Sequence, residues 1–456
     1  MAVAIVGGGI GGLTTAMYLA RAGQRVVVLE ASDRWGGSIV TGQGNGWLWE
    51  EGPNSFTPNG YLMELIEQLG LGEQVVWADP QLPRFVWWGN RLHPIPSSPP
   101  ALLSSSLLSP LGKLRALVGA LGFVPPAMHS AESVADFFRR HLGREVLEQL
   151  VAPFVSGVYA GDPQQLGVAS AFRRVWEMEQ LGGGLLAGFL LARKKMGKTP
   201  GRLGQLGSFR GGLAELPQAI VTKLRTLGVS LHQQWQVIKL SYDGQAYHIH
   251  AHTPAGAQVI TAAKVVLAIP AYSCAQVLAE LSPIASGELG TIYYPPVACV
   301  ALGYPLSALR QSLVGFGHLI PRGQGIRTLG TIWASSLFPD RAPAGYQLLL
   351  NFIGGSTDPQ IAQLTTDEIV TAVDQDLRQT LLQPSAPEPI VLAVHLWQRA
   401  IPQYDLHHVE RMAVIAKELS QYPHLYLVSN FTDGVAVGDC VRRGIETANQ
   451  LLSSGQ

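Results

Sequence analysis

The chain of 456 residues is too long for one ordinary hydrophobic core, so two or three domains are expected. Its 32 basic and 32 acidic residues cancel, which argues against a nucleic-acid-binding protein that relies on a basic surface. Only 14% of the residues are charged and the mean hydropathy is +0.18, which favours an apolar ligand or contact with a membrane. The three cysteines are widely separated, so neither a disulfide framework nor a metal site is predicted. We expect a reducing, cytoplasmic location.

The N-terminal region predicts a dinucleotide-binding unit. Residues 2–6 are a short β-prone run, a glycine-rich loop follows, and residues 13–23 have the apolar spacing of a helix. Such glycines allow a tight turn, a close approach of the backbone to a pyrophosphate, and close packing of the helix on the strand. Residues 24–29 predict a second buried strand, and the glutamate after it can accept hydrogen bonds from a ribose. The predicted contacts are Gly7, Gly8, Gly9, Ile10, Gly11, Gly12 and Glu30.

The segment that follows this unit, residues 31–38 (ASDRWGGS), resembles the D-R-x-G-G extension of the amine oxidase and protoporphyrinogen oxidase superfamily, which holds FAD. The paired glycines would let backbone amides reach a second part of an extended cofactor, and the arginine is suited to phosphate or ribose. Ser38 stands where a larger residue is common in that superfamily. The predicted FAD contacts of this segment are Arg34, Gly36, Gly37 and Ser38.

Between the ends of the chain lie two insertions of different character. Residues 96–206 are helical and rich in leucine, with an apolar run near 182–192 followed by Arg193, Lys194, Lys195 and Lys198. Apolar helices with a basic fringe suit attachment to a membrane surface, although a helical core or a dimer contact remains an alternative. Residues 271–409 contain strand-like runs at 297–305, 327–335 and 346–355 and a helical stretch at 365–382. They predict a mixed sheet with helices on one side, which could form the wall for a large flat substrate.

The fold class that we predict is α/β with three domains. A discontinuous, Rossmann-like FAD-binding domain comprises residues 1–70, 207–270 and 410–456, including strands near 236–238, 264–269 and 426–429. After the last strand, a helix is expected with Asp439 as its N-cap. The mixed α+β substrate-binding domain comprises residues 71–95 and 271–409, and the helical, membrane-associating domain comprises residues 96–206.

Three further segments are similar to the protoporphyrinogen oxidases of plants and cyanobacteria: residues 51–55, residues 132–143 with 152–163, and residues 330–343 with 352–356. With both ends, the resemblance covers nearly the whole chain. It implies an FAD-dependent, six-electron oxidation of protoporphyrinogen IX to protoporphyrin IX in haem and chlorophyll biosynthesis, with oxygen as the acceptor. It also implies peripheral membrane contact, a homodimer, and delivery of the product to a chelatase. No catalytic acid, base or nucleophile is assigned, because hydride transfer from a bridging carbon depends mainly on positioning.

The resemblance also assigns roles to individual residues. Arg84 would pair with a substrate propionate, and Gly161 would lie near the reacting macrocycle, with Ala160 in place of the first glycine of a Gly-Gly pair. Leu319, Ile332 and Phe352 would sandwich the pyrrole rings. A solvated arginine and ordinary core packing are the alternatives. The remaining FAD contacts that the resemblance implies are Gly52, Pro53, Asn54, Ser55, Val237, Trp397, Val435, Ala436 and Val437.

Other functions remain open at this point. A coproporphyrinogen III oxidase would use the same fold on a tetracarboxylate, and the few basic residues near Arg84 argue against it. A flavin-dependent isomerase and a non-catalytic FAD-binding protein are further alternatives. His248, His250 and His252 alternate along one predicted strand, and we interpret them as a solvated strand face and not as metal ligands.

Overall fold

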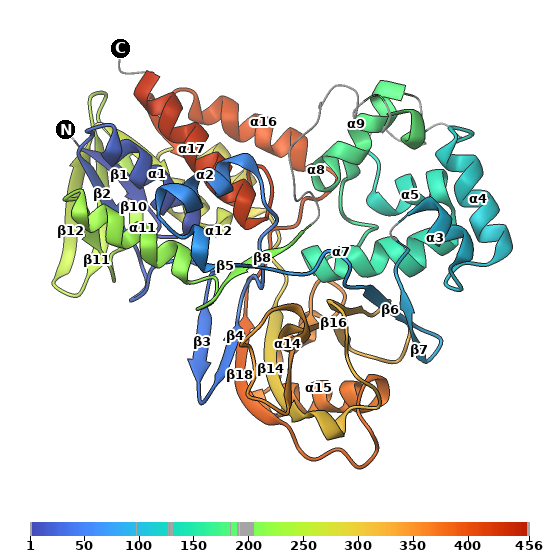
Figure 1. Ribbon diagram of the computed structural model, residues 1–456. Helices are drawn as coiled ribbons and strands as arrows, with labels where there is room; N and C mark the ends of the chain where they lie inside the picture. Colours follow the sequence, from blue (N-terminus) through green and yellow to red (C-terminus); the bar gives the residue numbers. More distant parts are fainter. Residues whose placement is uncertain are drawn as a thin grey trace.

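The structure is a computed structural model, and three parts of the chain are distinguishable in it (Figure 1). A layered α/β part contains both ends of the chain, a helical part lies beside it, and a large sheet with one long helix lies below both. The residues that it describes are 2–96, 98–125, 127, 131–182, 184–188, 191 and 205–453.

The α/β part is built on a parallel sheet of five strands in the order β19-β13-β1-β2-β9. Three stretches that are distant in the sequence contribute to it. The first supplies β1 and β2, the second supplies β9 and β13, and the third supplies β19. The strands are β1 (Val3–Val6), β2 (Val26–Leu29), β9 (Ser230–His232), β13 (Lys264–Leu267) and β19 (Leu425–Leu427).

The two faces of this sheet are covered by different elements, because alternate residues of each strand point to opposite sides. Val3 and Ile5 pack with the helices of one face, whereas Ala4 and Val6 pack on the other. The helices of the first face are α1 (Ile10–Arg21), α2 (Gly60–Gln68), α11 (Glu215–Thr226) and α17 (Val437–Ser453). The other face is covered by β10 (Gln236–Tyr242), β11 (Tyr247–Thr253), β12 (Gly256–Ala262), α12 (Ala271–Leu278), α13 (Pro283–Gly290) and α16 (His408–Leu419).

The second large unit is a mixed sheet of seven strands in the order β18-β14-β17-β16-β15-β6-β7. All its pairs are antiparallel except that of β15 with β6. Helix α15 (Thr366–Thr380), which begins with a capping box at Thr365, covers one face, so the predicted mixed sheet with a helix on one side is confirmed. The strands are β6 (Arg84–Trp88), β7 (Arg91–Pro94), β14 (Val297–Pro305), β15 (Gly317–Leu319), β16 (Thr328–Trp333), β17 (Tyr346–Gly354) and β18 (Ile390–Trp397).

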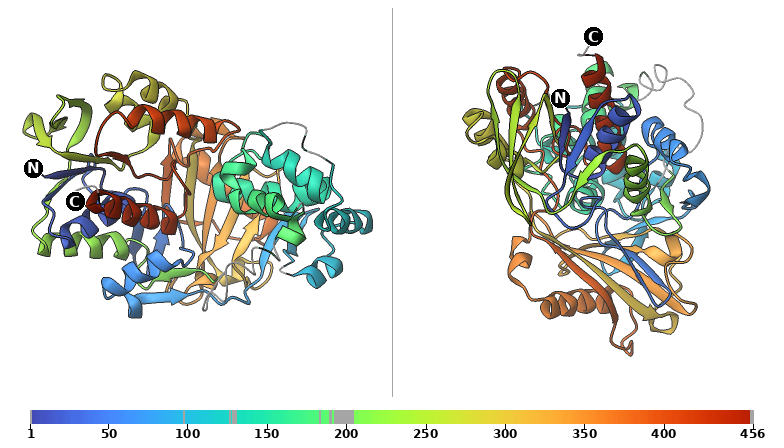
Figure 2. Two further views of the ribbon diagram at one scale, coloured as in Figure 1. Left: turned by 90° about the horizontal axis from the view of Figure 1, so that it is seen from above. Right: turned by 90° about the vertical axis from the view of Figure 1, so that its left-hand side faces the viewer.

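Short elements connect the α/β part to the seven-stranded sheet, and Figure 2 shows the two stacked with strands passing between them. The hairpin β3 (Thr41–Gly44) and β4 (Trp47–Glu50) packs its tryptophans on the face of the large sheet that α15 leaves free. Other short elements are β5 (Val75–Trp77), which pairs with β8 (Gly207–Phe209), and α14 (Ala334–Leu337).

The helical part has a core of its own around Phe137, Val155 and Leu166. It comprises α3 (Pro99–Ser104), α4 (Pro110–Ala120), α5 (Val134–Leu142), α6 (Arg144–Val146), a π-helical turn (Leu147–Val151), α7 (Ala152–Tyr159), α8 (Val168–Ala171) and α9 (Arg173–Gly182). Within the described part of the chain, no helix is long and apolar enough to cross a membrane. The predicted basic fringe, Arg193, Lys194, Lys195 and Lys198, lies outside the described residues.

Candidate active site

The glycine loop between β1 and α1 has the geometry that a pyrophosphate requires. Gly7 has a φ of +109°, and a Cβ at Gly12 would lie 2.2 Å from the Gly7 carbonyl oxygen, so both positions demand glycine. At Gly9, in contrast, a Cβ would meet no atom nearer than 3.9 Å, which leaves open space on that side of the loop. Gly9 caps α1 without a side chain, so the first amides of the helix are available to an anion.

The second pair of glycines lies directly against this loop. Gly9 and Gly36 form a parallel bridge, and the Gly36 amide donates a hydrogen bond to the Gly8 carbonyl oxygen at 2.9 Å. Gly36 and Gly37 have φ values of +110° and +61°, which favour glycine. The two glycine segments that the sequence predicted therefore meet at one place. Arg34 and Ser38 flank the pair, half-buried and exposed respectively.

Glu30 ends β2 beside the loop, where a ribose-binding carboxylate is expected. One carboxylate oxygen accepts from the Gly8 amide at 2.6 Å, and the other accepts from the amide and the hydroxyl of Ser32 at 2.8 Å each. These bonds fix the carboxylate and leave acceptor capacity for ligand hydroxyls. The Trp235 amide donates to the Glu30 carbonyl oxygen at 2.8 Å, which brings the start of β10 and Val237 into the same neighbourhood.

Residues 51–55 contain an unused polar donor. Asn54 is buried, and its side-chain nitrogen has no hydrogen-bond partner among the described residues. A Cβ at Gly52 would lie 1.9 Å from the Ser38 carbonyl oxygen, so this segment packs tightly on the paired-glycine segment. Because a buried unpaired amide is costly, Asn54 fits a position that faces a bound ligand. Pro53 and Ser55 flank it in the same segment.

Trp397, another of the predicted FAD contacts, lies beside that segment. Its indole N–H donates to the Glu51 carbonyl oxygen at 2.7 Å, and its ring stacks on His395 with 4.0 Å between centroids. The His395 ring is in turn 2.8 Å, nitrogen to oxygen, from the Glu51 carboxylate. Trp397 is therefore held against the predicted cofactor segment by a cluster that contains two charged or titratable side chains.

The C-terminal contacts reach the glycine loop through the packing of α17 on α1. A Cβ at Gly444 would lie 2.7 Å from the Gly11 carbonyl oxygen, which shows how closely the two helices approach. Val437 and Ile10 share one hydrophobic cluster. The segment that contains Val435, Ala436 and Val437 is thereby placed near the start of α1.

The prediction that Asp439 caps this helix is wrong. Helix α17 begins at Val437, so Asp439 lies in its first turn, and its amide donates to the Ala436 carbonyl oxygen at 3.0 Å. Gly434, with a φ of +94°, makes the turn that starts the helix earlier than the sequence pattern indicated. Partial burial raises the pKa of the Asp439 carboxyl above its ordinary value.

The predicted substrate residues other than Gly161 share one face of the seven-stranded sheet, opposite to α15. Paired residues in adjacent strands point to the same side, and residues two positions apart along a strand share that side. One row across the strands contains Arg84, Gly317, Ile332 and Leu350. The next row on the same face contains Leu319, Gly330, Phe352, Cys299 and His395.

A large cavity opens beside this face. Its volume is about 1050 Å³, and Arg84 lines it together with Ile95, Gln205 and Phe316. The Arg84 guanidinium lies 5.2 Å from the centre of the Phe316 ring, and no carboxylate among the described residues forms an ion pair with it. A free guanidinium at the edge of a cavity is suited to a carboxylate ligand.

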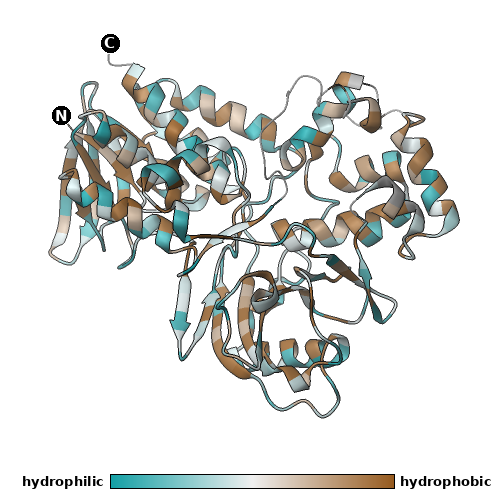
Figure 3. Ribbon diagram, viewed as in Figure 1, coloured by the Kyte–Doolittle hydropathy of each residue, from teal (hydrophilic) through white to brown (hydrophobic). Residues whose placement is uncertain are grey.

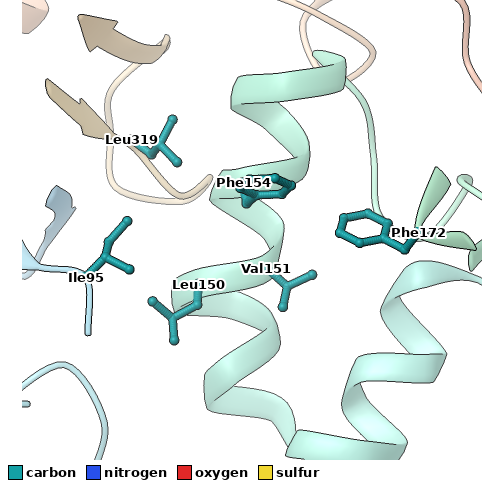
Figure 4. Close-up of a pocket in the computed structure, with 6 residues that line it drawn as sticks. All are labelled: Ile95, Leu150, Val151, Phe154, Phe172 and Leu319. Carbon is teal, nitrogen blue, oxygen red and sulfur yellow. The ribbon is translucent and has the colours of Figure 1, made fainter. Parts of the chain in front are cut away.

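A second, apolar cavity of about 230 Å³ shares Ile95 with the first. Figure 4 shows Leu319 and Ile95 on one side of it, opposite the helix that carries Leu150, Val151 and Phe154. That helix contains the π-helical turn before α7, a feature that often occurs at functional sites. Leu319, one of the residues predicted to sandwich the pyrrole rings, therefore faces open space. The other two, Ile332 and Phe352, are half-buried against neighbouring hydrophobic side chains.

The turn after α7 holds Gly161 close to Phe352. Ala160 has a left-handed backbone, with a φ of +49°, and packs in the cluster that Phe352 contacts. A Cβ at Gly161 would lie 2.5 Å from the side-chain oxygen of Gln403, so a larger residue here would require that side chain to move. Gln403 and its neighbour Tyr404 were not singled out from the sequence, because both act through partners far away in the chain.

Within the described ranges, no group of three or more histidine, cysteine, aspartate or glutamate side chains could hold a metal ion. His248 lies on the three-stranded sheet, and its ring nitrogen is 2.8 Å from an oxygen of the Asp243 carboxylate.

The comparisons with known proteins agree with this arrangement. The family described as flavin-containing amine oxidoreductase matches residues 10–452. The chloroplastic protoporphyrinogen oxidase of Oryza sativa subsp. japonica is 44% identical over 98% of this chain and 87% of its own length. The coproporphyrinogen III oxidase of Bacillus subtilis is 30% identical over 99% of this chain and 98% of its own.

A solved structure gives the same result at the level of the fold. The putative protoporphyrinogen oxidase from Exiguobacterium sp. 255-15 superposes with a TM-score of 0.80 over 99% of both chains, at 25% identity. The glycine segments, the unpaired Asn54 donor and these similarities fit FAD as the cofactor. The chain therefore belongs to the flavin-containing amine oxidoreductase family and, within it, to the protoporphyrinogen oxidases.

Proposed function

We propose that this protein oxidises protoporphyrinogen IX to protoporphyrin IX in haem and chlorophyll biosynthesis, removing six electrons in three two-electron steps with oxygen as the final acceptor. The observation that carries the proposal is a cavity of about 1050 Å³ that is lined by Arg84, which has no ion-pair partner among the described residues, and by apolar side chains such as Ile95 and Phe316. Leu319, on the same face of the large sheet as Arg84, lines the adjoining apolar cavity. A flat, apolar macrocycle with carboxylate side chains has matching chemistry.

FAD, when bound, supplies the acceptor for hydride that leaves a bridging carbon of the porphyrinogen. The protein would contribute binding and orientation. Arg84 would hold a propionate through its guanidinium, while Leu319, Ile332 and Phe352 would pack on the pyrrole rings and exclude water. The first amides of α1 would hold the pyrophosphate, and the start of α17 would stabilise negative charge on the reduced flavin. Asn54 would donate its unused N–H to the cofactor.

The cavity lining favours protoporphyrinogen over coproporphyrinogen. Arg84 is the only basic side chain among the described residues that line the large cavity, and Asp79 lines it too. Four propionates would be repelled more strongly by the Asp79 carboxylate than two, and one arginine would neutralise a smaller share of their charge. Turnover of both porphyrinogens under matched conditions, followed by porphyrin fluorescence, tests this choice, and a strong preference for coproporphyrinogen would overturn it.

Anaerobic reduction is the direct test of the proposed reaction. The purified yellow protein is mixed with protoporphyrinogen IX without oxygen, and oxygen is then admitted. We expect the flavin absorption to bleach, porphyrin fluorescence to appear, and the flavin absorption to recover with formation of hydrogen peroxide. Bound FAD that never bleaches would indicate a non-catalytic flavin protein, and a product of unchanged redox state without peroxide would indicate an isomerase.

We further propose that the protein attaches to the surface of a membrane through α4. The inner face of this helix has only small residues, Gly112, Ala116 and Gly119, which allow close packing on α5. Large apolar residues lie outside instead, so the usual pattern of a surface helix is inverted. Figure 3 shows hydrophobic residues along α4 at the outer end of the helical part. The exposed fractions are Leu111 78%, Leu114 57%, Leu117 50%, Leu121 55% and Phe123 73%.

The remaining proposals rest on the family resemblance or on the sequence pattern. From the resemblance come a homodimer and delivery of the product to a chelatase, whereas the cytoplasmic location and the three-domain division given above rest on the sequence pattern itself. One boundary of that division carries a structural complication, since α12 and α13 pack on the five-stranded sheet although they follow residue 270. Sedimentation velocity at several protein concentrations tests the dimer, and a constant monomer mass would contradict it.

A further inference from the structure

A short segment, residues 401–405, lies between the proposed cofactor site and the proposed substrate wall. It follows β18 and precedes α16, and it forms no regular strand or helix of its own apart from a bridge of Asp405 with Leu166. Its backbone is nevertheless fixed on both sides. The Gly167 amide donates to the Tyr404 carbonyl oxygen at 2.8 Å, and the Gln403 amide donates to the Tyr293 carbonyl oxygen at 2.9 Å.

The Tyr404 side chain spans the turn that leads into α17. Its hydroxyl donates to the Asn430 carbonyl oxygen and accepts from the Gly434 amide, the latter at 2.9 Å. The residue is only 3% exposed, and its ring stacks on His408 with 4.4 Å between centroids. Burial raises the pKa of Tyr404 well above its ordinary value, so the hydroxyl keeps its proton. One phenol thus closes both ends of the turn that precedes Val435.

The Gln403 side chain acts on the opposite side of the segment. Its nitrogen donates to the Tyr159 carbonyl oxygen at 2.8 Å, at the last residue of α7. Its oxygen fills the space where a Cβ of Gly161 would be, and it accepts from the Ser356 hydroxyl at 3.5 Å. The side chain is 6% exposed. Gln403 therefore fixes the turn that carries Ala160 and Gly161 beside Phe352.

We propose that Gln403 and Tyr404 are positioning residues that together set the spacing between the flavin and its substrate. Tyr404 holds the turn that aims the start of α17 at the flavin, and Gln403 holds the Ala160–Gly161 backbone against the macrocycle. The inference rests on the proposed function for the identity of the two ligands. It adds that two neighbouring side chains, with different hydrogen-bond partners, join the cofactor contact to the substrate contact.

The two side chains should have separable effects on the holoenzyme. In Tyr404→Phe the α17 turn loosens, so the reduced flavin loses stabilisation relative to the oxidised flavin. A tenfold loss would lower the two-electron midpoint potential by about 30 mV. In Gln403→Met the potential should match that of the wild type, whereas KM for protoporphyrinogen IX should rise about tenfold with a smaller change in kcat.

Matched controls separate positioning from general loss of stability. Tyr247→Phe removes another buried hydroxyl that donates to a backbone carbonyl oxygen, Pro423 at 2.7 Å, and Gln383→Met removes an amide that donates to Leu309 at 2.9 Å. Both controls should keep the potential and KM of the wild type. The potential is measured spectroscopically with a chemical reductant and needs only bound FAD, so this readout is independent of the substrate.

The outcomes are distinct. A potential shift in Tyr404→Phe that is absent in Tyr247→Phe supports the inference, as does a rise of KM confined to Gln403→Met. Equal potentials in Tyr404→Phe and the wild type, or a shift of the potential in Gln403→Met as large as that in Tyr404→Phe, would overturn it. If Tyr404→Phe is too unstable to purify, the Gln403→Met arm decides alone, and an unchanged KM rejects the inference. Failure of wild-type bleaching by protoporphyrinogen would reject the proposed function instead.

Discussion

At the scale of single residues, Arg84 carries the strongest expectation about substrate binding. Arg84→Ala should lower kcat/KM for protoporphyrinogen IX by ten- to a hundredfold, because a hydrogen bond to a charged group contributes about 1.5–3 kcal/mol. Stopped-flow reduction of the flavin measures this effect, and the flavin spectrum should stay that of the wild type. Arg91→Ala, on the neighbouring strand β7, is the matched control. Equal losses in both variants would contradict a specific role for Arg84.

Ala160 is a test of backbone strain near the macrocycle. A left-handed conformation costs a non-glycine residue about 1–2 kcal/mol, whereas glycine loses about 0.5–1 kcal/mol of chain entropy. Burial of the alanine methyl group stabilises the wild type by about 0.8 kcal/mol, which offsets part of the strain. Ala160→Gly should therefore change the free energy of unfolding by less than about 0.5 kcal/mol. Ala372→Gly, within helix α15, should lose about 1 kcal/mol, and a comparable loss at residue 160 would refute the strain argument.

Glu50 gives a pH dependence with a definite sign. Burial raises its pKa from 4.5 to about 7, although Thr41 and the Leu213 amide donate hydrogen bonds to the carboxylate. A carboxyl whose pKa is raised by folding stabilises the protein fully below pH 4.5, and this contribution is lost as the pH rises through about 7. Glu50→Gln should remove this loss. The midpoint temperature of thermal unfolding should then fall less between pH 5.5 and pH 8 in the variant than in the wild type.

The exposed substitution Glu64→Gln controls for the removal of one carboxylate in that experiment. If wild type and Glu50→Gln lose the same stability between the two pH values, Glu50 does not titrate in this range in the folded protein.

Single residues also show what sequence reasoning could reach. The glycine loop was predictable because its glycines recur at a fixed spacing within one short segment, although the atoms nearest to a Cβ at Gly7 belong to Ala268, far away in the sequence. The Glu51 contact with His395 and the Tyr404 contact with Gly434 join segments whose proximity depends on the whole fold. No local pattern marks such pairs, and a buried Gln or Tyr in a loop resembles ordinary packing.

At the scale of elements, strands and helices were predicted best where one face is clearly apolar. The runs at β14, β16 and β17 and the helix α15 were found from composition and spacing. The sheet on which α12 and α13 pack was not predicted, because the sequence of a helix indicates that it packs but not which sheet it covers. The start of α17 was misplaced because the turn at Gly434 and a phenol from a distant segment decide where that helix begins.

Helix α4 gives the element-scale prediction. Leu114→Glu and Leu117→Glu place charge on a face that is already exposed, so the free energy of unfolding should change by less than about 0.5 kcal/mol. Each substitution should instead reduce co-sedimentation with liposomes severalfold, since burial of a leucine contributes about 1.5–3 kcal/mol. Leu306→Glu, at an exposed leucine of the large-sheet part, should leave liposome binding unchanged. If the wild-type protein does not co-sediment with liposomes, the proposed attachment is wrong.

At the scale of the whole molecule, cofactor binding should stabilise a structure that joins both ends of the chain. FAD at a hundredfold excess over Kd stabilises the protein that binds it by about 2.7 kcal/mol. Gly444→Ala should diminish both this effect and the stability of the apoprotein, because the new Cβ would lie 2.7 Å from the Gly11 carbonyl oxygen. Calorimetry with and without FAD measures both quantities.

The control for that prediction is another glycine within a helix. A Cβ at Gly287, in α13, would have no atom within 4 Å, so Gly287→Ala should stabilise the protein by about 0.5–1 kcal/mol. If Gly444→Ala behaves like Gly287→Ala, the close approach of α17 to α1 does not control cofactor binding.

The strand order of the five-stranded sheet has a consequence for the newly made chain. The glycine loop leaves the ribosome together with β1 and β2, which pair with each other, yet β1 also pairs with β13, and β13 pairs with β19 near residue 425. At roughly 5–20 residues per second, on the order of a minute of translation separates the synthesis of β1 from that of β19. Until β13, β19 and α17 have been made, β1 lacks one side of its sheet and α1 lacks the helix that packs on it, so we expect flavin capture only after α17 has packed on α1.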